Sequence, residues 1–176
     1  MDIVRWDGSP VARDGIETIF FEASGTKDFA SADARDAFLE RWLGRYLIHD
    51  PSHVFMAIDG QGAVAGYLVG CLDDPARTPR FSDIGYFAEF AHLTARYPAH
   101  LHVNLAARTR GAGVGSRLVE AFCEQLQAAG LLGVHVVTGQ GVRNVGFYER
   151  LGFFERGVAA FNGHGIVFLG RDLALN

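Results

Sequence analysis

A glycine-rich segment in the second half of the chain has the composition of an anion-binding turn. It covers residues 110–116, after the β-rich run 100–105 and before a stretch with helical periodicity. Glycines let the backbone approach a ligand closely and point successive N–H groups at it. The N-terminus of the following helix adds free N–H groups and the positive end of its dipole. The spacing therefore predicts a phosphate site, to which Arg108, Arg110 and Arg117 would add positive charge.

Two common phosphate-binding loops do not fit this segment. A Walker loop requires GxxxxGK[ST], and residues 110–116 contain no Lys. A dinucleotide-binding turn requires GxGxxG in the first βαβ unit and an acidic residue at the end of the next strand. Here the turn is central in the chain, and the next β-rich run, 134–138, ends without an acid. The anion is therefore expected to be the pyrophosphate of another cofactor, and a turn that only packs is the alternative.

The hydrophobic pattern predicts the elements that must position this turn. Strands are expected at residues 2–6, 54–58, 63–69, 100–105, 134–138, 157–161 and 166–169. Helices are expected at residues 11–23, 32–48, 82–95, 115–129 and 142–151. Ser31 is expected to cap the second helix, and residues 59–62 to form a hairpin turn. Strands that alternate with helices predict a mixed α/β sheet in one layered domain over residues 1–176.

The composition is that of a globular domain. The chain has 176 residues, of which 49% are hydrophobic and 20% charged, and its net charge is −4. This charge argues against a nucleic-acid or anionic-membrane surface. A cytoplasmic location is expected, since no signal peptide or bilayer-spanning run is visible and the two cysteines have the pattern of buried thiols. No metal is expected, because no metal-ligand spacing links His49, His53, His92, His135 and His164.

Two motifs together resemble the GNAT superfamily of N-acetyltransferases. Residues 110–115, RGAGVG, match the family's [Q/R]-x-x-G-x-[G/A] loop, and residues 147–153, FYERLGF, match its F-Y-x-x-x-G-F segment. The resemblance covers nearly the whole chain, because the expected element order also fits. It implies a GNAT fold, which is a mixed, mostly antiparallel sheet of about six or seven strands with helices on both faces. It also implies an acetyl-CoA-dependent acetyltransferase, in which an amine attacks directly in a ternary complex.

The resemblance further implies which residues bind acetyl-CoA. The loop would hold the pyrophosphate, a backbone N–H of the preceding strand would bind the thioester oxygen as an oxyanion-type contact, and a tyrosine hydroxyl would approach the sulfur. These residues are Val103, Asn104 and Leu105 in the strand, Arg110, Gly111, Ala112, Gly113, Val114, Gly115 and Ser116 in the loop, and Tyr148. For Tyr148, the alternative is a core tyrosine whose hydroxyl is bonded locally.

One position departs from the family's pattern. The family usually has N-x-x-A-x-x-F-Y, but this chain has Gly141 at the Asn position and Asn144 at the Ala position. On one continuous helix, Gly141, Asn144 and Tyr148 would share a face. Asn144 is therefore expected to contact the cofactor in place of the missing Asn, and a polar residue near a helix start is the alternative.

Acyl transfer to an amine also needs a neutral amine and a proton for the leaving thiolate. For a lysine-like pKa of ~10.4, the neutral form costs about 4.6 kcal/mol at pH 7, so a base would help. His100, His102 and Asn104 alternate with apolar residues along the expected strand, which predicts a polar face and a hydrated cleft. His102 is expected to be the base because it lies nearer to the expected thioester, and a structural histidine is the alternative. Tyr148 is the expected general acid.

The pattern leaves the acceptor open. An amino acid, a peptide amine, an amino sugar and a small metabolite are all compatible with it. Residues 73–98 are expected to form a wall on the acceptor side, although most of their aromatics, Phe81, Tyr86, Phe87, Phe90 and Tyr97, are expected in the core. Residues 96–105 are similar to the start of the corresponding strand in the acetyltransferase-like C-terminal domain of O-GlcNAcases, so the chain resembles a free-standing bacterial relative. A catalytically silent acetyl-CoA sensor is therefore the alternative function, and a nucleotide-binding protein unrelated to CoA is a third.

Overall fold

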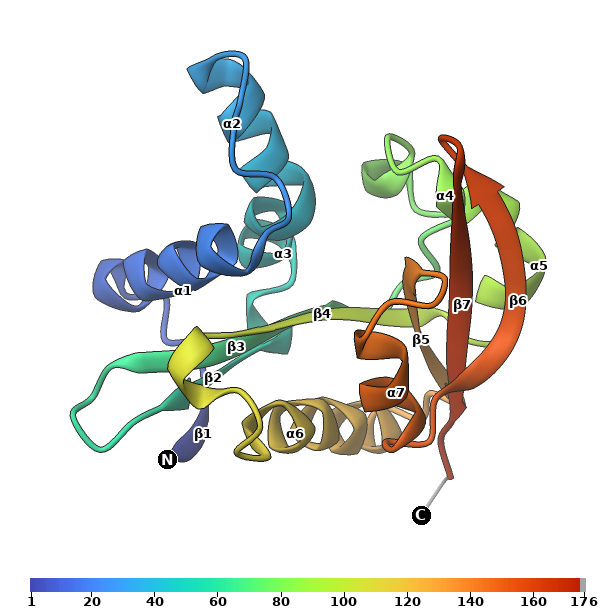
Figure 1. Ribbon diagram of the computed structural model, residues 1–176. Coiled ribbons are helices and arrows are strands. Elements are labelled where there is room, and N and C mark those ends of the chain that lie inside the picture. The colour runs from blue at the N-terminus through green and yellow to red at the C-terminus, as the bar shows by residue number, and fades with distance from the viewer. Residues whose placement is uncertain (175–176) are drawn as a thin grey trace. The chain divides into compact units, whose positions relative to one another are not determined.

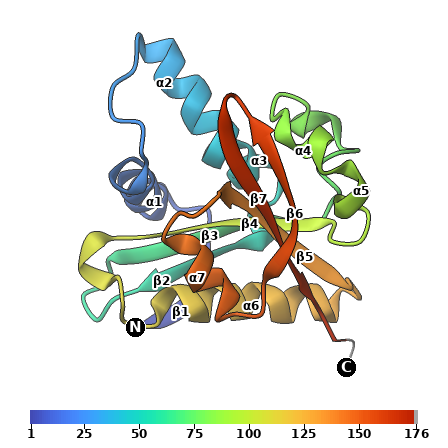
Figure 2. The same cartoon turned by 45° about the vertical axis from the view of Figure 1, so that its right-hand side comes forward.

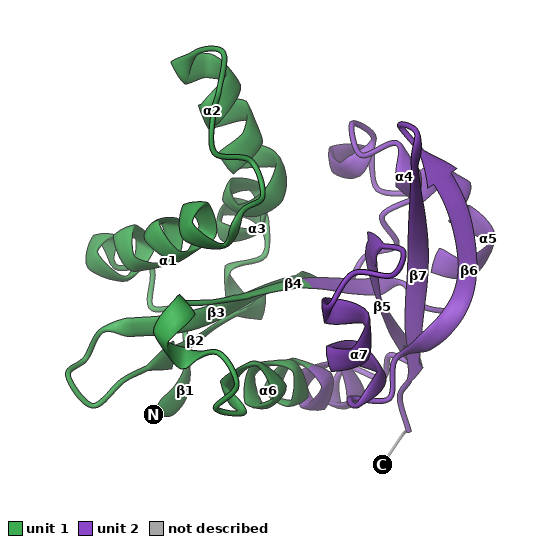
Figure 3. Ribbon diagram, in the orientation of Figure 1, with its two compact units in different colours: residues 1–71, 102–122 green, residues 72–101, 123–176 purple. Residues whose placement is uncertain are grey.

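The computed structural model describes residues 1–174, which form two compact units (Figures 1 and 3). Unit 1 comprises Met1–Cys71 and His102–Phe122, and unit 2 comprises Leu72–Leu101 and the described part of Cys123–Asn176. Strand β4 (Ala99–Leu105) and helix α6 (Val114–Ala128) each contribute residues to both units.

Unit 1 contains an antiparallel meander. Strand β1 (Asp2–Arg5) pairs with β2 (Val54–Ile58), which pairs with β3 (Val64–Cys71). Both strands of the β2–β3 hairpin are apolar and almost entirely buried, which confirms the predicted hairpin. Asp59 Oδ1 holds the turn by accepting hydrogen bonds from the backbone N–H groups of Gln61 and Ala63, at 3.0 Å each. Within this unit, α1 (Pro10–Ala23) and the first part of α6 cover opposite faces of the strands (Figures 1 and 2).

One continuous helical stretch follows α1 and contains a π-helical turn. It consists of α2 (Ala32–Leu39), the π turn (Glu40–Gly44) and α3 (Arg45–His49), and Ser31 caps it by accepting from Ala34 N at 3.1 Å. This confirms the helix and the cap that the sequence predicts. The π turn is unpredicted, and the buried Arg45 spans it by donating to Glu40, with Nη2 2.7 Å from Oε2. Such turns concentrate at functional sites.

Unit 2 contains the other strand ladder. Ala99 and His100 of β4 pair in parallel with Val134 and His135 of β5 (Gly133–Gly139). Strand β5 pairs antiparallel with β7 (His164–Asp172), and β7 pairs with β6 (Phe154–Phe161) across a turn in which Gly163 has a φ of +77°. Phe90, Tyr97 and Phe168 form a buried aromatic cluster against these strands.

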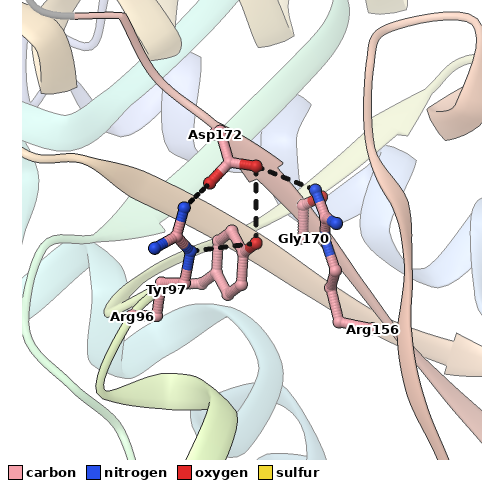
Figure 4. A network of polar contacts seen from close by, with 5 residues as sticks. All are labelled: Arg96, Tyr97, Arg156, Gly170 and Asp172. Carbon is pink, nitrogen blue, oxygen red and sulfur yellow. Dashed lines mark hydrogen bonds and ion pairs between the residues drawn. The ribbon is translucent and has the colours of Figure 1, made fainter.

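A polar network ties the end of β7 to this unit (Figure 4). Asp172 Oδ1 accepts from Arg96 Nη2 at 2.7 Å, and its Oδ2 accepts from Arg156 Nη2 at 2.8 Å and from the Tyr97 hydroxyl at 3.5 Å. One carboxylate thus bridges the segment before β4 and strand β6. The arginine side chains are 70% and 31% exposed, so water screens their charges and each pair contributes only modestly to stability.

The predicted helix over residues 82–95 is wrong. The segment instead contains two short helices, α4 (Tyr86–Glu89) and α5 (Ala91–Thr94), and a 3₁₀ turn (Pro79–Phe81) precedes it. Phe90 interrupts the two helices with φ −104° and ψ 16°. Its ring is buried, as are those of Phe81 and Phe87, so burial of aromatics outweighs continuation of the helix.

The strand order is β1-β2-β3-β4-β5-β7-β6. One parallel pair, β4–β5, stands among the antiparallel pairs described for residues 1–174. This confirms the predicted α/β class with a mixed, mostly antiparallel sheet of seven strands. The expectation of a single domain stays a prediction. None of the helices within residues 1–174 is both long enough and apolar enough to cross a membrane.

Candidate active site

The glycine-rich loop forms an open turn at the start of α6. Gly111 and Gly113 have φ values of +81° and +75°, the left-handed region that favours glycine. A Cβ added at either position would meet no atom of residues 1–174 within 4 Å. Helix α6 begins at Val114, and the N–H of Arg117 donates to Gly113 O at 3.2 Å. The first N–H groups of a helix have no intrahelical acceptor, so this turn combines such donors with free space above the loop.

The arginines near the loop have different partners. Arg108 Nη2 donates to Asp59 Oδ2 at 3.2 Å and to Val64 O at 3.3 Å, so it anchors the β2–β3 turn. Arg117 Nη1 donates to Met1 O at 2.8 Å. Arg110 is exposed and makes one long contact, with Leu105 O at 3.5 Å. Of the three arginines that the sequence places near the anion site, Arg110 is therefore the one best able to turn toward a ligand.

The second half of β4 is the part of the strand that reaches the surface. Ala99, His100 and Leu101 are buried, whereas residues 102–105 are half-buried. Gly66 of β3 lies so close to this half that an added Cβ would be 3.2 Å from Asn104 O. Asn104 Nδ2 donates to the Tyr67 hydroxyl at 2.8 Å, which fixes the amide. The side chain of Asn104 is thus held in place on the half-buried end of β4, between Val103 and Leu105.

His102 lies against two aromatic side chains of the stretch from α2 to α3. Its Nε2 is 3.2 Å from the Tyr46 hydroxyl, and its ring meets the Trp42 ring edge-on at 5.7 Å between centroids. Burial lowers the pKa of His102 to about 4 from its usual 6.5, because the charged imidazolium loses hydration. The imidazole is therefore neutral at pH 7 and can accept a proton, although it is a weak base.

A pocket of about 320 Å³ opens beside this histidine, within unit 1. It is lined by Phe20, Ser24, Gly25, Thr26, Phe38, Trp42, His102 and Asn104. The predicted polar face of β4 therefore lines a pocket at His102 and Asn104. His100 does not line it, since its ring is 2% exposed and packs on Phe81 at 4.8 Å within unit 2.

Replacement of His102 by Gln is expected to reduce the loss of stability in acid. The pKa of His102 is about 4 in the folded chain but ordinarily 6.5, so as the pH falls the unfolded chain binds the proton before the folded chain does. The stabilisation that comes from the lowered pKa of His102 is therefore fully present above pH 6.5 and is lost as the pH falls toward 4. Urea unfolding at pH 7.5 and pH 4.5 should show a smaller difference for His102→Gln than for wild type. The exposed His164→Gln variant is the control, and an identical pH difference for both variants would contradict the burial argument.

Tyr148 and Asn144 lie on helix α7 (Asn144–Glu149) in unit 2. The Tyr148 ring is 6% exposed and packs on Phe147 and Phe153, with centroids 5.0 and 5.6 Å away. Its hydroxyl makes no hydrogen bond within residues 1–174, and burial raises its pKa. The hydroxyl thus keeps its proton at neutral pH. The alternative of a core tyrosine with a locally bonded hydroxyl does not fit the described residues.

Gly141 does not share a helical face with Tyr148, which corrects the expectation of one continuous helix. Helix α7 begins at Asn144, and Gly141 precedes it with a φ of +73°, where glycine is favoured over Asn. Asn144 and Tyr148 remain four residues apart on the helix, on the same side. Asn144 Oδ1 accepts from Thr138 Oγ1 at 3.0 Å, which orients the amide and leaves Nδ2 without a partner among residues 1–174.

The sequence reasoning missed the aromatic lining of the pocket. Phe38, Trp42 and Tyr46 have the spacing of a core-facing helix, yet only Tyr46 is fully buried, and Phe38 and Trp42 line the pocket. The aromatics of residues 73–98 lie mostly in the core of unit 2, as expected, and the wall that this segment was expected to form stays a prediction. Among residues 1–174, no group of three or more His, Cys, Asp and Glu side chains could hold a metal ion.

Comparison with known proteins agrees with the fold of the chain. The structure of SsHAT superposes with a TM-score of 0.74 at 25% identity, covering 98% of each chain. PH1933 from Pyrococcus horikoshii OT3 has a TM-score of 0.74 at 14% identity, with 99% of each chain covered. An N-acetyltransferase from Staphylococcus aureus Mu50 has a TM-score of 0.67 at 16% identity, with 98% of each chain covered. Residues 16–153 match the acetyltransferase (GNAT) family, and since this is well over half of the sequence, the chain belongs to that family.

Proposed function

We propose that the protein is an acetyl-CoA-dependent N-acetyltransferase that transfers the acetyl group directly to an amine in a ternary complex. The observation that carries the proposal is the open loop with Gly111 and Gly113 at the N-terminus of the 15-residue helix α6. Acetyltransferase chemistry is common to the family to which the chain belongs. The amine acceptor and the order of events are the new parts of the proposal.

The residues of the loop fit the pyrophosphate of acetyl-CoA. Backbone N–H groups at a helix N-terminus suit a phosphate, and the left-handed glycines leave room for its close approach. The residues proposed to hold it are Arg110, Gly111, Ala112, Gly113, Val114, Gly115 and Ser116. The half-buried end of β4, Val103, Asn104 and Leu105, is proposed to bind the arm and thioester oxygen through its backbone.

The remaining roles are assigned from the protonation states of Tyr148 and His102 and from the orientation of the Asn144 amide. Acetyl-CoA, when bound, supplies the acetyl group as a thioester. The Tyr148 hydroxyl, which burial keeps protonated, is proposed to donate a proton to the leaving sulfur. His102, which is neutral above pH 4, is proposed to accept a proton from the amine nitrogen. Asn144 is proposed to use its oriented Nδ2 to bind a carbonyl of the cofactor arm.

Replacement of Gly113 by Asp is expected to weaken acetyl-CoA binding by on the order of 100-fold. The carboxylate would stand where the pyrophosphate is proposed to bind, so that two anions would face each other with little water between them. Isothermal titration calorimetry with acetyl-CoA measures the effect. Gly163→Asp is the matched control, since Gly163 has a φ of +77° in equally open space at the β6–β7 turn. Equal acetyl-CoA affinity of the two folded variants would overturn the loop assignment.

A catalytically silent acetyl-CoA sensor would bind acetyl-CoA in the same way but would not transfer its acetyl group. Thiol release from acetyl-CoA across a panel of amines separates the two functions. We also propose the closer relationship to the acetyltransferase-like domain of O-GlcNAcases, on the segment 96–105, and a cytoplasmic location. These two statements rest on the sequence alone.

A further inference from the structure

We propose that the pocket beside His102 binds the acceptor and selects weakly basic aromatic amines, which combine a flat apolar body with a nitrogen that is uncharged at neutral pH. The proposal rests on the acetyltransferase function above and names its substrate class. It is carried by the shape, the polarity and the charge of the eight lining residues.

The pocket has aromatic walls. Phe20 and Phe38 pack with centroids 5.4 Å apart, and the Trp42 ring stands edge-on to His102. All three side chains line the cavity, whose volume of about 320 Å³ is at the low end of the range for small-molecule sites. Such walls favour a planar ring, which gains contact area and ring–ring contacts at little entropic cost.

The lining holds no formal charge at pH 7. Its polar members are Ser24, Thr26, His102 and Asn104, and His102 is neutral. Asn104 donates through Nδ2 to the Tyr67 hydroxyl, and its Oδ1 accepts no hydrogen bond within residues 1–174, so this oxygen is available as an acceptor for an amine N–H. An ammonium group placed here would lose hydration without gaining a carboxylate from the lining.

Two charged side chains next to the pocket in the chain, Lys27 and Glu22, are engaged elsewhere. Lys27 Nζ donates to Phe21 O and Glu22 O at 2.9 Å each, at the C-terminal end of α1. The carboxylate of Glu22 accepts from Ala107 N at 3.0 Å. These contacts hold the segment that carries Ser24 and Thr26, and they leave neutral groups to line the pocket.

The chemistry of the amine agrees with this lining. An alkyl amine with a pKa of ~10.4 is neutral in only roughly one molecule in 2,500 at pH 7. His102 is a weak base, because burial lowers its pKa to about 4, so it removes a proton from an alkylammonium inefficiently. An arylamine needs no such step, since delocalisation of its lone pair into the ring keeps the nitrogen unprotonated at pH 7.

Binding of two amines that each carry an aromatic ring, without acetyl-CoA, tests the proposal. The probes are p-toluidine, which is neutral at pH 7.5, and benzylamine, a cation with a similar ring. The chain has two tryptophans, Trp6 and Trp42, so a ¹H–¹⁵N spectrum reports on the pocket through the Trp42 indole, with Trp6→Phe giving the assignment. We expect p-toluidine to shift the Trp42 signal with a Kd at least about tenfold below that of benzylamine. Equal or tighter binding of benzylamine, or no shift with p-toluidine, would overturn the proposal.

Two variants locate the binding. Gly25 lines the pocket, has open space around its Cβ position and no left-handed φ, so Gly25→Phe should fill the pocket without disturbing the fold. Gly60→Phe, in equally open space in the β2–β3 turn, is the matched control. We expect the first to abolish the p-toluidine shift and the second to preserve it. Retained binding in Gly25→Phe would show that the amine binds elsewhere.

A charge substitution tests selectivity. Thr26→Asp adds a carboxylate to the lining and should raise the affinity for benzylamine several-fold while leaving p-toluidine nearly unchanged. An unchanged benzylamine affinity would contradict the charge argument. Acetyl-CoA calorimetry is run on the same samples. Binding of acetyl-CoA without amine selectivity defeats this inference alone, whereas loss of acetyl-CoA binding defeats the proposed function and leaves the amine titration interpretable.

Discussion

Tyr148→Phe is expected to lower kcat by about 10²–10⁴ while acetyl-CoA affinity stays within several-fold of wild type. The substitution keeps the ring and its packing on Phe147 and Phe153. It breaks no hydrogen bond within residues 1–174, so the free energy of unfolding should change little. What it removes is the proton that burial retains on the hydroxyl by raising its pKa.

The measurement is the rate of thiol release from acetyl-CoA with an accepted amine at saturating concentrations. Tyr86→Phe is the control, because Tyr86 is another tyrosine of unit 2 whose pKa burial raises. It should turn over at the wild-type rate. Because the pKa of Tyr148 lies above its ordinary value of 10, kcat should not fall through ionisation of this group below pH 10. Wild-type turnover by Tyr148→Phe, with chemistry rate-limiting, would mean that water protonates the sulfur.

Strands were the more predictable part of the fold. The apolar runs of β2 and β3, separated by the turn residues 59–62, predict a buried hairpin, and the structure confirms it. The pattern of residues 82–95 predicts one helix, but this segment instead contains two short helices separated at Phe90. Periodicity tells which residues are buried, whereas continuity of a helix depends on the neighbours available to bury them.

The loop was also predictable, because glycine positions encode backbone conformation locally. Gly111 and Gly113 adopt left-handed φ values, as a close-approach turn requires. The pocket was not predictable, because its lining residues come from segments far apart in the sequence: α1 and the residues after it, α2, the π turn and β4. The spacing of Trp42 predicts a core residue, but its side chain is half-buried. Trp42 lies in the π turn, and hydrophobic spacing does not predict such a turn. The partner of His102, Tyr46, lies 56 residues away in the chain.

Gly70→Ala is expected to destabilise the folded chain by about 1–3 kcal/mol, although alanine ordinarily stabilises a strand relative to glycine. An added Cβ at Gly70 would lie 2.8 Å from Cε1 and Cε2 of Phe122, within the van der Waals distance. The ring is completely buried and stands near Phe55 and His53, with centroids 6.4 and 6.5 Å away. It therefore has little room to move.

A double-mutant cycle separates this clash from a general effect of alanine. Phe122→Leu removes ring atoms and should destabilise by itself, but Gly70→Ala should cost much less in that background, with a coupling of at least about 1 kcal/mol. Gly60→Ala, in open space, is the control and should change stability by no more than about 0.5 kcal/mol. Urea unfolding measures all four variants. Additive free-energy changes would show that the ring adjusts and that Gly70 is not required for its packing.

The contact between a Cβ at position 70 and the Phe122 ring is also expected to influence the glycine-rich loop. Phe122 lies on the part of α6 that belongs to unit 1, and the helix N-terminus carries the open turn at Gly113. A Cβ at Gly70 must displace either the ring or the helix. If the helix moves, the N–H groups proposed to bind pyrophosphate move relative to the end of β4, and acetyl-CoA affinity falls together with stability. If only the ring moves, Gly70→Ala loses stability, but its affinity for acetyl-CoA, measured by calorimetry, remains that of wild type. The loop would then be positioned by the turn at Thr109, whose Oγ1 donates to Ala65 O at 2.8 Å.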